Sequence, residues 1–236
     1  MPEIKEYKKN IVLGLIYRFS KKLYFLSAKT RFKIFSELEW IFDRLAFEEA
    51  YQAFGFKAHP LNFHNLDFFE RHINKTSRIV DLGSGRGYFS NLLGPKAKEI
   101  IAVEINKASF EKAKETSSQQ NVKFVNSEAF DFLKRTRERY DILILSHFLE
   151  HVKEPEALLM LCKTIFNHIY IEVPDYDKTL LNHYRLLAFS NPPYTDNTHF
   201  NEFSRHELHE LLKKCDYKIT DEEYRFGFIR LWCKPN

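Results

Sequence analysis

Short apolar runs alternate with polar, amphipathic stretches from residue 78 onward, and this alternation restricts the available folds more than any other feature. The apolar runs cover 78–82, 99–103, 122–125, 141–145 and 168–173, while helical patterning fills 87–93, 107–119, 128–137 and 153–166. Near-continuous apolar strands separated by helices are typical of a parallel sheet covered on both faces. The pattern predicts a doubly wound α/β fold.

The chain changes character after residue 173. Residues 174–203 hold several prolines around a predicted helix over 177–189, which indicates a substrate-side insertion rather than sheet. Ser204 and Glu207 have capping-box spacing and predict a helix that ends near residue 214. Runs at 217–224 and 228–233 flank Gly227 and predict a hairpin. We therefore expect a mostly parallel, seven-stranded sheet with an antiparallel edge strand.

Residues 1–75 have helical patterning throughout, so we expect an N-terminal helical cap before an α/β domain over 76–236. Residues 1–35 carry nine Lys and Arg against two Glu. Contact with nucleic acid or with a membrane surface stays an alternative role for this basic arm. Its aromatic side chains are expected to form core, and they are Tyr17, Phe19, Tyr24, Phe25, Phe32, Phe35, Trp40 and Phe42.

The composition bears on the cellular compartment. Three widely spaced cysteines without a CxxC pair indicate reduced thiols. The longest apolar run, 11–17, is far shorter than the ~20 residues that span a bilayer. We therefore expect a cytoplasmic protein without a transmembrane segment.

Glycine is scarce, with 7 in 236 residues, yet Gly83, Gly85 and Gly87 fall within five positions directly after the 78–82 strand. A glycine turn between a parallel strand and a helix is where doubly wound folds bind nucleotides. Glu104 closes the next strand, where a carboxylate accepts ribose hydroxyls. Asp81 suits a cationic ligand better than a pyrophosphate, and Tyr88 departs from the dinucleotide fingerprint. A dehydrogenase is therefore disfavoured.

The segment 81–87 resembles the first motif of the class I S-adenosylmethionine-dependent methyltransferases. Residues 124–131 are similar to their segment after the third strand, 140–152 to the fourth motif of the small-molecule branch with its Leu-Glu-His-Val signature, and 198–208 to a later stretch of that branch. The resemblance covers about 76–234 and implies a Rossmann-like fold. The cofactor residues that it implies are Asp81, Gly83, Ser84, Gly85, Gly87, Glu104, Ile105, Glu128, Ala129, Ser146 and His147.

Ionisable residues beyond the fourth and fifth strands face the expected acceptor side. His199 and His151 are candidate bases, and Glu150 belongs to the same signature, although it could merely cap a helix. His147 and His151 are four residues apart, but no further ligand cluster is apparent, so no metal is expected.

The tetrapeptide 191–194, Asn-Pro-Pro-Tyr, spells a motif with which nucleic-acid amino-methyltransferases hold a flipped base. In those enzymes it directly follows the fourth strand, whereas Asn191 lies beyond the fifth strand here. A proline-rich lid turn is the favoured interpretation of these residues. An RNA or DNA amino-methyltransferase that uses Asn191 and Tyr194 stays an alternative.

The resemblance implies methyl transfer from S-adenosylmethionine to a hydroxyl or amine of a small polar metabolite. A sugar or phosphorylated precursor of a cell-surface glycan is the suggested acceptor class. Nucleic acid is a less favoured partner, and the oligomeric state is not indicated. A pseudoenzyme that binds the cofactor without turnover is a further alternative.

Overall fold

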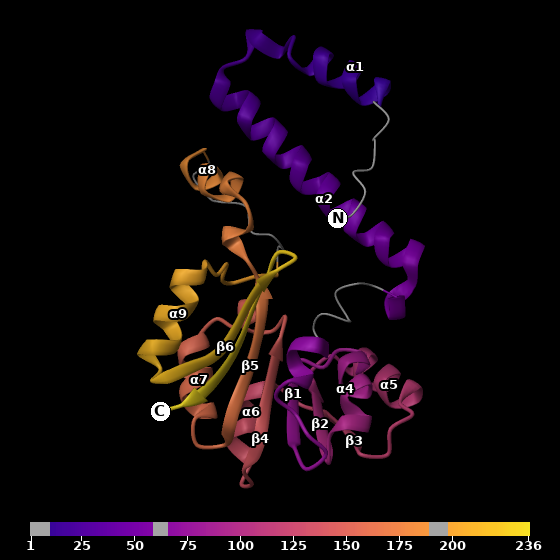
Figure 1. Ribbon diagram of the computed structural model, residues 1–236, viewed down its shortest axis with the longest axis vertical. Helices are drawn as coiled ribbons and strands as arrows, with labels where there is room; N and C mark the ends of the chain where they lie inside the picture. The colour runs from indigo at the N-terminus through magenta and orange to yellow at the C-terminus, as the bar shows by residue number, and fades with distance from the viewer. Residues whose placement is uncertain (1–9, 59–65, 189–197) are drawn as a thin grey trace, which may run out of the picture.

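The computed structural model describes residues 10–58, 66–188 and 198–236, and a seven-stranded sheet forms its centre (Figure 1). The strands are β1 (Arg78–Leu82), β2 (Glu99–Glu104), β3 (Val122–Asn126), β4 (Tyr140–Ser146), β5 (Phe166–Pro174), β6 (Tyr217–Arg225) and β7 (Phe228–Pro235). Their order is β3-β2-β1-β4-β5-β7-β6, and the first five are parallel. The predicted doubly wound, mostly parallel sheet is confirmed.

The hairpin of β6 and β7 completes one side of the sheet. β7 runs antiparallel to both β5 and β6, so the antiparallel strand lies second from the edge and β6 is outermost. Gly227 supplies a positive φ of 79° in the turn, a conformation that glycine adopts without a Cβ clash. In this register Arg230 of β7 lies opposite Glu172 of β5, which brings an arginine into the centre of the sheet.

Helices follow most strands, as the alternation predicts. They are α4 (Tyr88–Leu93), α5 (Lys107–Thr116), α6 (Ala129–Arg135), α7 (Pro155–Cys162), α8 (Leu180–Ala188) and α9 (Arg205–Lys214). Two predicted helices end early: α5 stops at Thr116 because Ser117 is extended, and α7 stops at Cys162, shortly before β5 begins. The predicted capping box of Ser204 and Glu207 is present at the start of α9.

Two apolar clusters lie on opposite faces of the sheet, because successive strand side chains point to opposite sides. Val80 and Leu82 belong to the cluster shared with α6, α7 and α9. Ile79 belongs to the other cluster, where residues 66–70 form a helical turn. That turn places Phe68 and Phe69 beneath the sheet, both fully buried. A segment of the expected N-terminal cap is therefore part of the core of the α/β domain.

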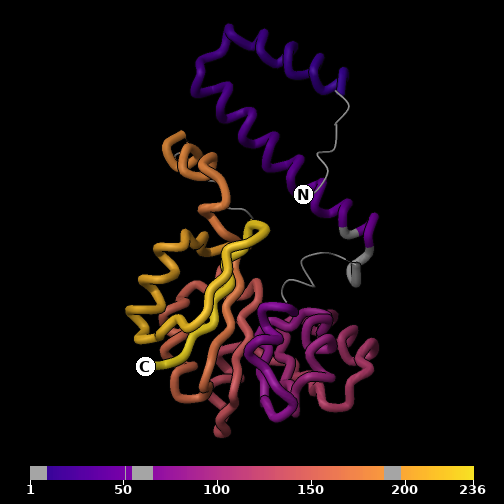
Figure 2. Tube along the Cα trace, in the orientation of Figure 1, coloured from indigo at the N-terminus to yellow at the C-terminus, as the bar shows by residue number. Residues whose placement is uncertain are grey.

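The helices α1 (Ile11–Ser20) and α2 (Ala28–Ala58) form an arm that extends away from the sheet (Figures 1 and 2). The expectation that its aromatic residues form core is wrong for several of them. Tyr17, Phe19, Tyr24, Phe25 and Phe42 are between 63% and 80% exposed. The physical reason is geometric: α1 and the η1 turn (Leu23–Phe25) have no buried residue, and within the described part of the chain they extend away from the sheet.

The arm joins the body through α8. Arg185 of α8 donates from Nη2 to the backbone oxygen of Ser36, 2.9 Å away, and forms an ion pair with Glu39 of α2. Phe32 and Tyr184 meet edge to face with ring centroids 6.2 Å apart. These contacts fix α2 against the inserted segment and not against the sheet itself.

Candidate active site

The glycine turn between β1 and α4 has the left-handed backbone that its sequence predicts. Gly83, Gly85 and Gly87 have φ values of 77°, 55° and 71°. A Cβ on Gly83 would lie 2.5 Å from the ring of Phe148, and one on Gly87 would overlap the ring of Phe124. A Cβ on Gly85 would meet nothing within 4 Å. The backbone at Gly85 therefore borders open space that a ligand can approach.

Glu104 at the end of β2 holds this turn in place. Its Oε2 accepts a hydrogen bond from the backbone nitrogen of Gly85 at 2.8 Å, and its Oε1 accepts one from that of Asn106 at 2.6 Å. A carboxylate has about four lone-pair sites, so both oxygens keep capacity for further donors. This is the position at which the sequence predicted a contact with ribose hydroxyls.

Asp81 lies beneath the turn and is almost completely buried. Ser90 of α4 donates its hydroxyl to Oδ2 of Asp81 at 2.5 Å. Burial raises the pKa of this carboxyl to about 6, against the hydrogen bond from Ser90 and with the help of the nearby Glu104 charge. A cationic ligand at the turn would favour the charged form.

Three more of the predicted cofactor residues, Ile105, Glu128 and Ala129, lie just after the ends of β2 and β3. Glu128 caps the N-terminus of α6 by accepting from the backbone nitrogen of Asp131 at 3.0 Å, and Ala129 begins that helix. Ile105 is exposed directly after Glu104. The backbone nitrogen of Ser127 donates to the backbone oxygen of Glu104 at 3.2 Å, which joins the two strand ends. An apolar side chain and a carboxylate thus flank the turn on this side.

Ser146 and His147 end β4 on the other side of the turn. His147 has a positive φ of 50°, uncommon for a residue with a side chain. Its ring lies between Glu150 and Glu172, with Nδ1 to Oε1 at 3.5 Å and Nε2 to Oε1 at 3.3 Å. The side chain of His147 is 45% exposed, and the carboxylates of Glu150 and Glu172 raise its pKa well above the ordinary value. A cationic imidazole therefore borders the cofactor side.

Glu172 is fully buried and contacts several of the residues around it. It accepts hydrogen bonds from Ser146 Oγ at 3.0 Å and Tyr170 OH at 3.1 Å, and it pairs with Arg230 Nε at 2.6 Å. Burial would raise its pKa, yet His147 and Arg230 lower it to about 2. Sequence reasoning missed Arg230, although a lone arginine in the apolar run 228–233 was a visible signal.

The residues around the glycine turn fit S-adenosylmethionine. Ser84 Oγ is buried and has no hydrogen-bond partner among the described residues. Gly85 offers backbone next to open space, Glu104 has acceptor capacity for two hydroxyls, and Asp81 supplies a buried carboxyl for a cationic centre. The predicted cofactor residues come together because the carboxyl ends of β1, β2, β3 and β4 meet at one edge.

The three candidate catalytic residues also come together. Glu150 and His151 lie in the η3 turn (Leu149–His151), and His199 follows the second gap in the described chain. The rings of His151 and His199 meet edge to face with centroids 4.7 Å apart. Through His147, which approaches Glu150, this cluster is contiguous with the end of β4. The candidate bases are therefore neighbours of His147, which is one of the predicted cofactor residues.

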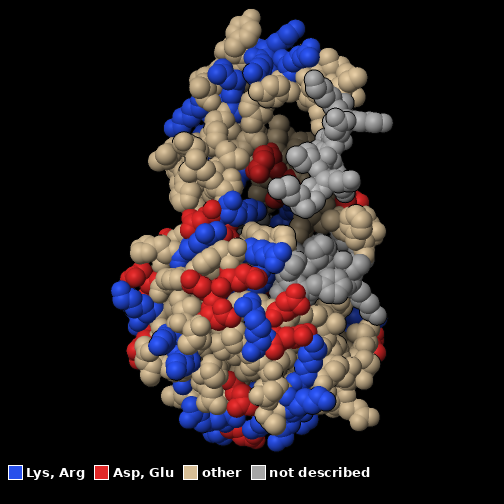
Figure 3. All heavy atoms as spheres, viewed as in Figure 1, with Lys and Arg blue, Asp and Glu red and all other residues tan. Residues whose placement is uncertain are grey.

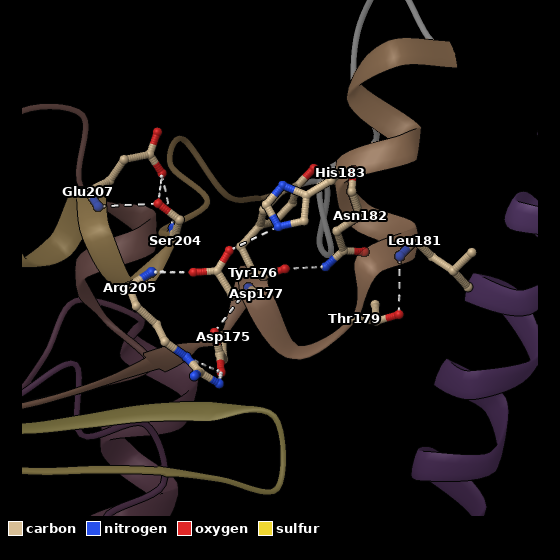
Figure 4. Close-up of polar contacts among 10 residues, drawn as sticks. All are labelled: Asp175, Tyr176, Asp177, Thr179, Leu181, Asn182, His183, Ser204, Arg205 and Glu207. Atoms are coloured by element: carbon tan, nitrogen blue, oxygen red, sulfur yellow. Dashed lines mark hydrogen bonds and ion pairs between the residues drawn. The ribbon is translucent and has the colours of Figure 1, made fainter.

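Other ionisable residues of the inserted segment have structural partners (Figure 4). Asp175 pairs with Arg205 at 2.7 Å, and Asp177 accepts from the backbone nitrogen of Arg205 at 2.9 Å. His183 Nε2 lies 3.1 Å from Asp177 Oδ1. These contacts fasten α8 and the η4 turn (Tyr176–Lys178) to α9, so they position the insertion. The motif at Asn191 to Tyr194 lies outside the described residues.

A family model for a methyltransferase domain matches residues 51–222. The ubiquinone biosynthesis O-methyltransferase of Coxiella burnetii is 25% identical over 109 residues, 45% of this chain and 47% of that protein. An uncharacterized RNA methyltransferase of Mycoplasma mobile is 26% identical over 167 residues, 70% of this chain and 40% of that protein. The matches therefore span less than half the length of these curated relatives.

Solved structures share the fold. A SAM-dependent methyltransferase from Archaeoglobus fulgidus superposes with a TM-score of 0.58 at 20% identity, over 80% of this chain and 99% of that one. Magnesium protoporphyrin IX methyltransferase from Synechocystis, with bound SAH, gives a TM-score of 0.57 at 14% identity, over 75% and 82%. The chain therefore belongs to the methyltransferase-domain family, and it has the fold of these SAM-dependent methyltransferases.

Proposed function

We propose that this protein transfers the methyl group of S-adenosylmethionine to a hydroxyl of a small polar molecule, with an amine as the second acceptor type. The observation that carries the proposal is the cluster of Glu150, His151 and His199 beside the cofactor edge. Such a cluster can take up the proton that a hydroxyl loses on methylation. The similarity to a protein named as an O-methyltransferase supports an oxygen acceptor.

The chemistry is an in-line displacement. S-adenosylmethionine held at the glycine turn and Glu104 would supply the methyl group, so that a C–O bond to the acceptor would form as the C–S bond breaks and the hydroxyl proton would leave to a base. The residues of this chain contribute position, exclusion of water and proton uptake. His151 is exposed while the side chain of His199 is only 7% exposed, so His151 is the base with access to an acceptor.

Calorimetric titration with S-adenosylmethionine tests the cofactor part. We expect wild-type protein to bind and Glu104→Ala to lose at least tenfold in affinity, because the variant loses the acceptor at the ribose position. Glu99→Ala is the matched control, since Glu99 lies at the opposite end of β2 and pairs with Arg78 and Lys123. Unchanged binding in Glu104→Ala would contradict the assignment.

Transfer of labelled methyl groups into a cell extract tests the reaction. We expect a labelled small molecule, with loss of labelling in His151→Gln. The same assay addresses the pseudoenzyme alternative, which predicts no labelled product despite cofactor binding.

A nucleic-acid acceptor is the second candidate, favoured by the similarity to an uncharacterized RNA methyltransferase over 70% of this chain. It predicts salt-dependent retardation of RNA or DNA by the protein. It also predicts that Asn191→Ala abolishes labelling of nucleic acid while cofactor binding persists. Absence of retardation at low salt would exclude it.

A further inference from the structure

The geometry points to a divalent-cation site formed by Glu150, His151 and His199. One ligand atom from each residue lies within 4.8 Å of the other two, among the described residues. Two ligands on one ion at about 2.1 Å are at most ~4.2 Å apart, so only a small adjustment of the three side chains would bring them onto one ion. Chain spacing alone gave no sign of this site, because His199 is distant from the other two in sequence.

The Glu150 carboxylate is the first independent sign of a missing ligand. Its residue is 1% exposed, and neither carboxylate oxygen accepts a hydrogen bond from the described residues. Its nearest cationic neighbour is His147, 3.5 Å from Oε1. Burying a carboxylate with so few partners is unfavourable. A bound cation would neutralise the negative charge shared by Oε1 and Oε2 of Glu150.

The two imidazoles are held in the way that metal-binding histidines are held. His151 Nδ1 lies 3.2 Å from the backbone oxygen of Thr198, and His199 Nδ1 lies 2.9 Å from Glu202 Oε1. Metal-ligating histidines typically donate their second ring nitrogen to a carbonyl or carboxylate, which fixes the tautomer and orients Nε2. Both rings thus have the outer contacts expected of Nε2 ligands.

The backbone joins the two ligand-bearing segments rigidly. The backbone nitrogens of Phe200 and Asn201 donate to the backbone oxygen of Glu150 at 2.8 and 3.1 Å. The Asn201 side chain donates to the backbone oxygen of Val152 at 2.7 Å. The cluster is therefore a built arrangement of two segments that are far apart in the chain.

Two imidazoles and one carboxylate suit a divalent first-row transition ion such as Zn²⁺, with coordination positions left for substrate oxygen. An ion here would bind the acceptor hydroxyl and lower its pKa, and because His151 would then be a ligand, the proton would leave to water and not to His151. This role rests on the proposed function, whereas binding of the ion does not.

Titration of the chelator-treated full-length chain with Co²⁺, followed by visible absorption and Zn²⁺ competition, tests the site. We expect saturable binding of one ion per chain, weakened at least tenfold in Glu150→Gln, His151→Gln and His199→Gln. His206→Gln is the matched control, because His206 is exposed on α9 outside the cluster. His151→Gln alters an exposed side chain and keeps the test valid if a buried variant fails to fold.

The results separate the cation site from the proposed function. Absence of saturable binding, or equal weakening in His206→Gln, overturns the site. Calorimetry of S-adenosylmethionine in chelator is run in parallel. If the wild-type protein binds S-adenosylmethionine but no cation, the cation site is rejected and the proposed function stands. If it binds the cation but transfers no methyl group, the proposed function is rejected and the cation site stands.

We also infer, from a different observation, that the outer arm, residues 10–36, docks on a bilayer with anionic headgroups. Seven apolar or aromatic residues of α1 are between 57% and 76% exposed, namely Ile11, Val12, Leu13, Leu15, Ile16, Tyr17 and Phe19. A helix that is apolar on all sides is stable only when something covers it. Among the described helices, none is long and apolar enough to cross a membrane, so α1 would lie in the interface.

The positive charge of the outer arm favours an anionic membrane surface as its partner. Residues 10–36 hold six Lys and Arg and no acidic residue, and blue Lys and Arg spheres gather over this part in Figure 3. The body below it shows interspersed red and blue side chains. An apolar surface whose charged residues within 10–36 are all cationic matches acyl chains beneath anionic headgroups.

Cosedimentation of the full chain with phosphatidylcholine vesicles, with and without phosphatidylglycerol, tests the docking. We expect binding to the anionic vesicles only, reduced at least tenfold by Ile16→Asp and by Lys21→Glu with Lys22→Glu. Met160→Asp is the control, because Met160 is half-exposed on α7 in the body. Sedimentation without lipid that shows α1-dependent self-association, together with no vesicle binding, would assign the surface to a second copy and overturn the inference.

Discussion

At the scale of single residues, the buried carboxyl of Asp81 makes the stability of the fold depend on pH. Its pKa is about 6 in the folded chain, above the ordinary 3.8. A carboxyl with a raised folded-state pKa adds stability below the unfolded pKa, and this stability is lost as the pH rises through 6. The shift corresponds to about 3 kcal/mol, at about 1.4 kcal/mol for each pKa unit. Above pH 6 the charged form of Asp81 therefore costs stability.

Asp81→Asn should therefore stabilise the free protein above pH 7 by about 2 kcal/mol and leave it unchanged near pH 4. Asparagine keeps an acceptor for Ser90 but removes the charge. Urea unfolding at both pH values measures the difference, and calorimetry should show weakened cofactor binding. A variant that is less stable than wild type at pH 7 would contradict this account.

The buried pair of Glu172 and Arg230 is a second residue-scale feature, and both side chains are fully buried. Arg230→Met should cost about 3 kcal/mol, because it removes one cation from a buried carboxylate. The double variant with Glu172→Gln should lose less than the two single variants added together, since no buried charge of this pair remains. A double-mutant cycle by chemical unfolding measures the coupling. If the losses of unfolding free energy in the two single variants add up to the loss in the double variant, Glu172 and Arg230 are not coupled.

At the scale of elements, two glycines of the glycine turn have different roles: Gly87 matters for packing, and Gly85 matters for the approach of a ligand. A Cβ on Gly87 would overlap the ring of Phe124, while a Cβ on Gly85 would enter open space. We expect Gly87→Ala to destabilise the fold by about 2 kcal/mol or more, from strain and overlap together. Gly85→Ala should cost about 1 kcal/mol from backbone strain alone, yet it should block cofactor binding.

Thermal unfolding and cofactor calorimetry on the same two variants separate the tasks. Ala113 is buried in α5, and its Cβ would lie 3.2 Å from a Cβ on Gly87, so Ala113→Gly is a control for loss of stability without obstruction of the turn. Equal loss of stability in both glycine variants would contradict the division.

Sequence patterns predicted the elements that depend on local chemistry. The glycine turn, the capping box of Ser204 and the hairpin at Gly227 each follow from neighbouring residues, and the structure contains all three. The approach of His199 to His151 and the register of Arg230 opposite Glu172 depend on tertiary packing instead. The wrong expectation for the arm has a related cause. An apolar helical pattern indicates that the helix avoids water, but it does not indicate what covers the helix.

At the scale of the whole molecule, the arm is attached through α8 by few contacts. Arg185→Met removes the link to Ser36 and Glu39. We expect faster hydrogen exchange over residues 28–50 with the unfolding transition of the sheet nearly unchanged. Arg44→Met is the control, because Arg44 pairs with Glu48 within α2. Unaltered exchange in Arg185→Met would show that other contacts hold the arm.

The strand order has a consequence for biosynthesis. β7 follows every other strand in the sequence, yet it lies between β5 and β6. While a ribosome is still translating residues 228–235, β5 presents an unpaired strand edge and Glu172 lacks Arg230. Exposed edges of this kind pair readily with other chains. The nascent protein is thus most exposed to aggregation just before synthesis of β7 is complete, and insertion of that strand both closes the edge and neutralises the buried carboxylate.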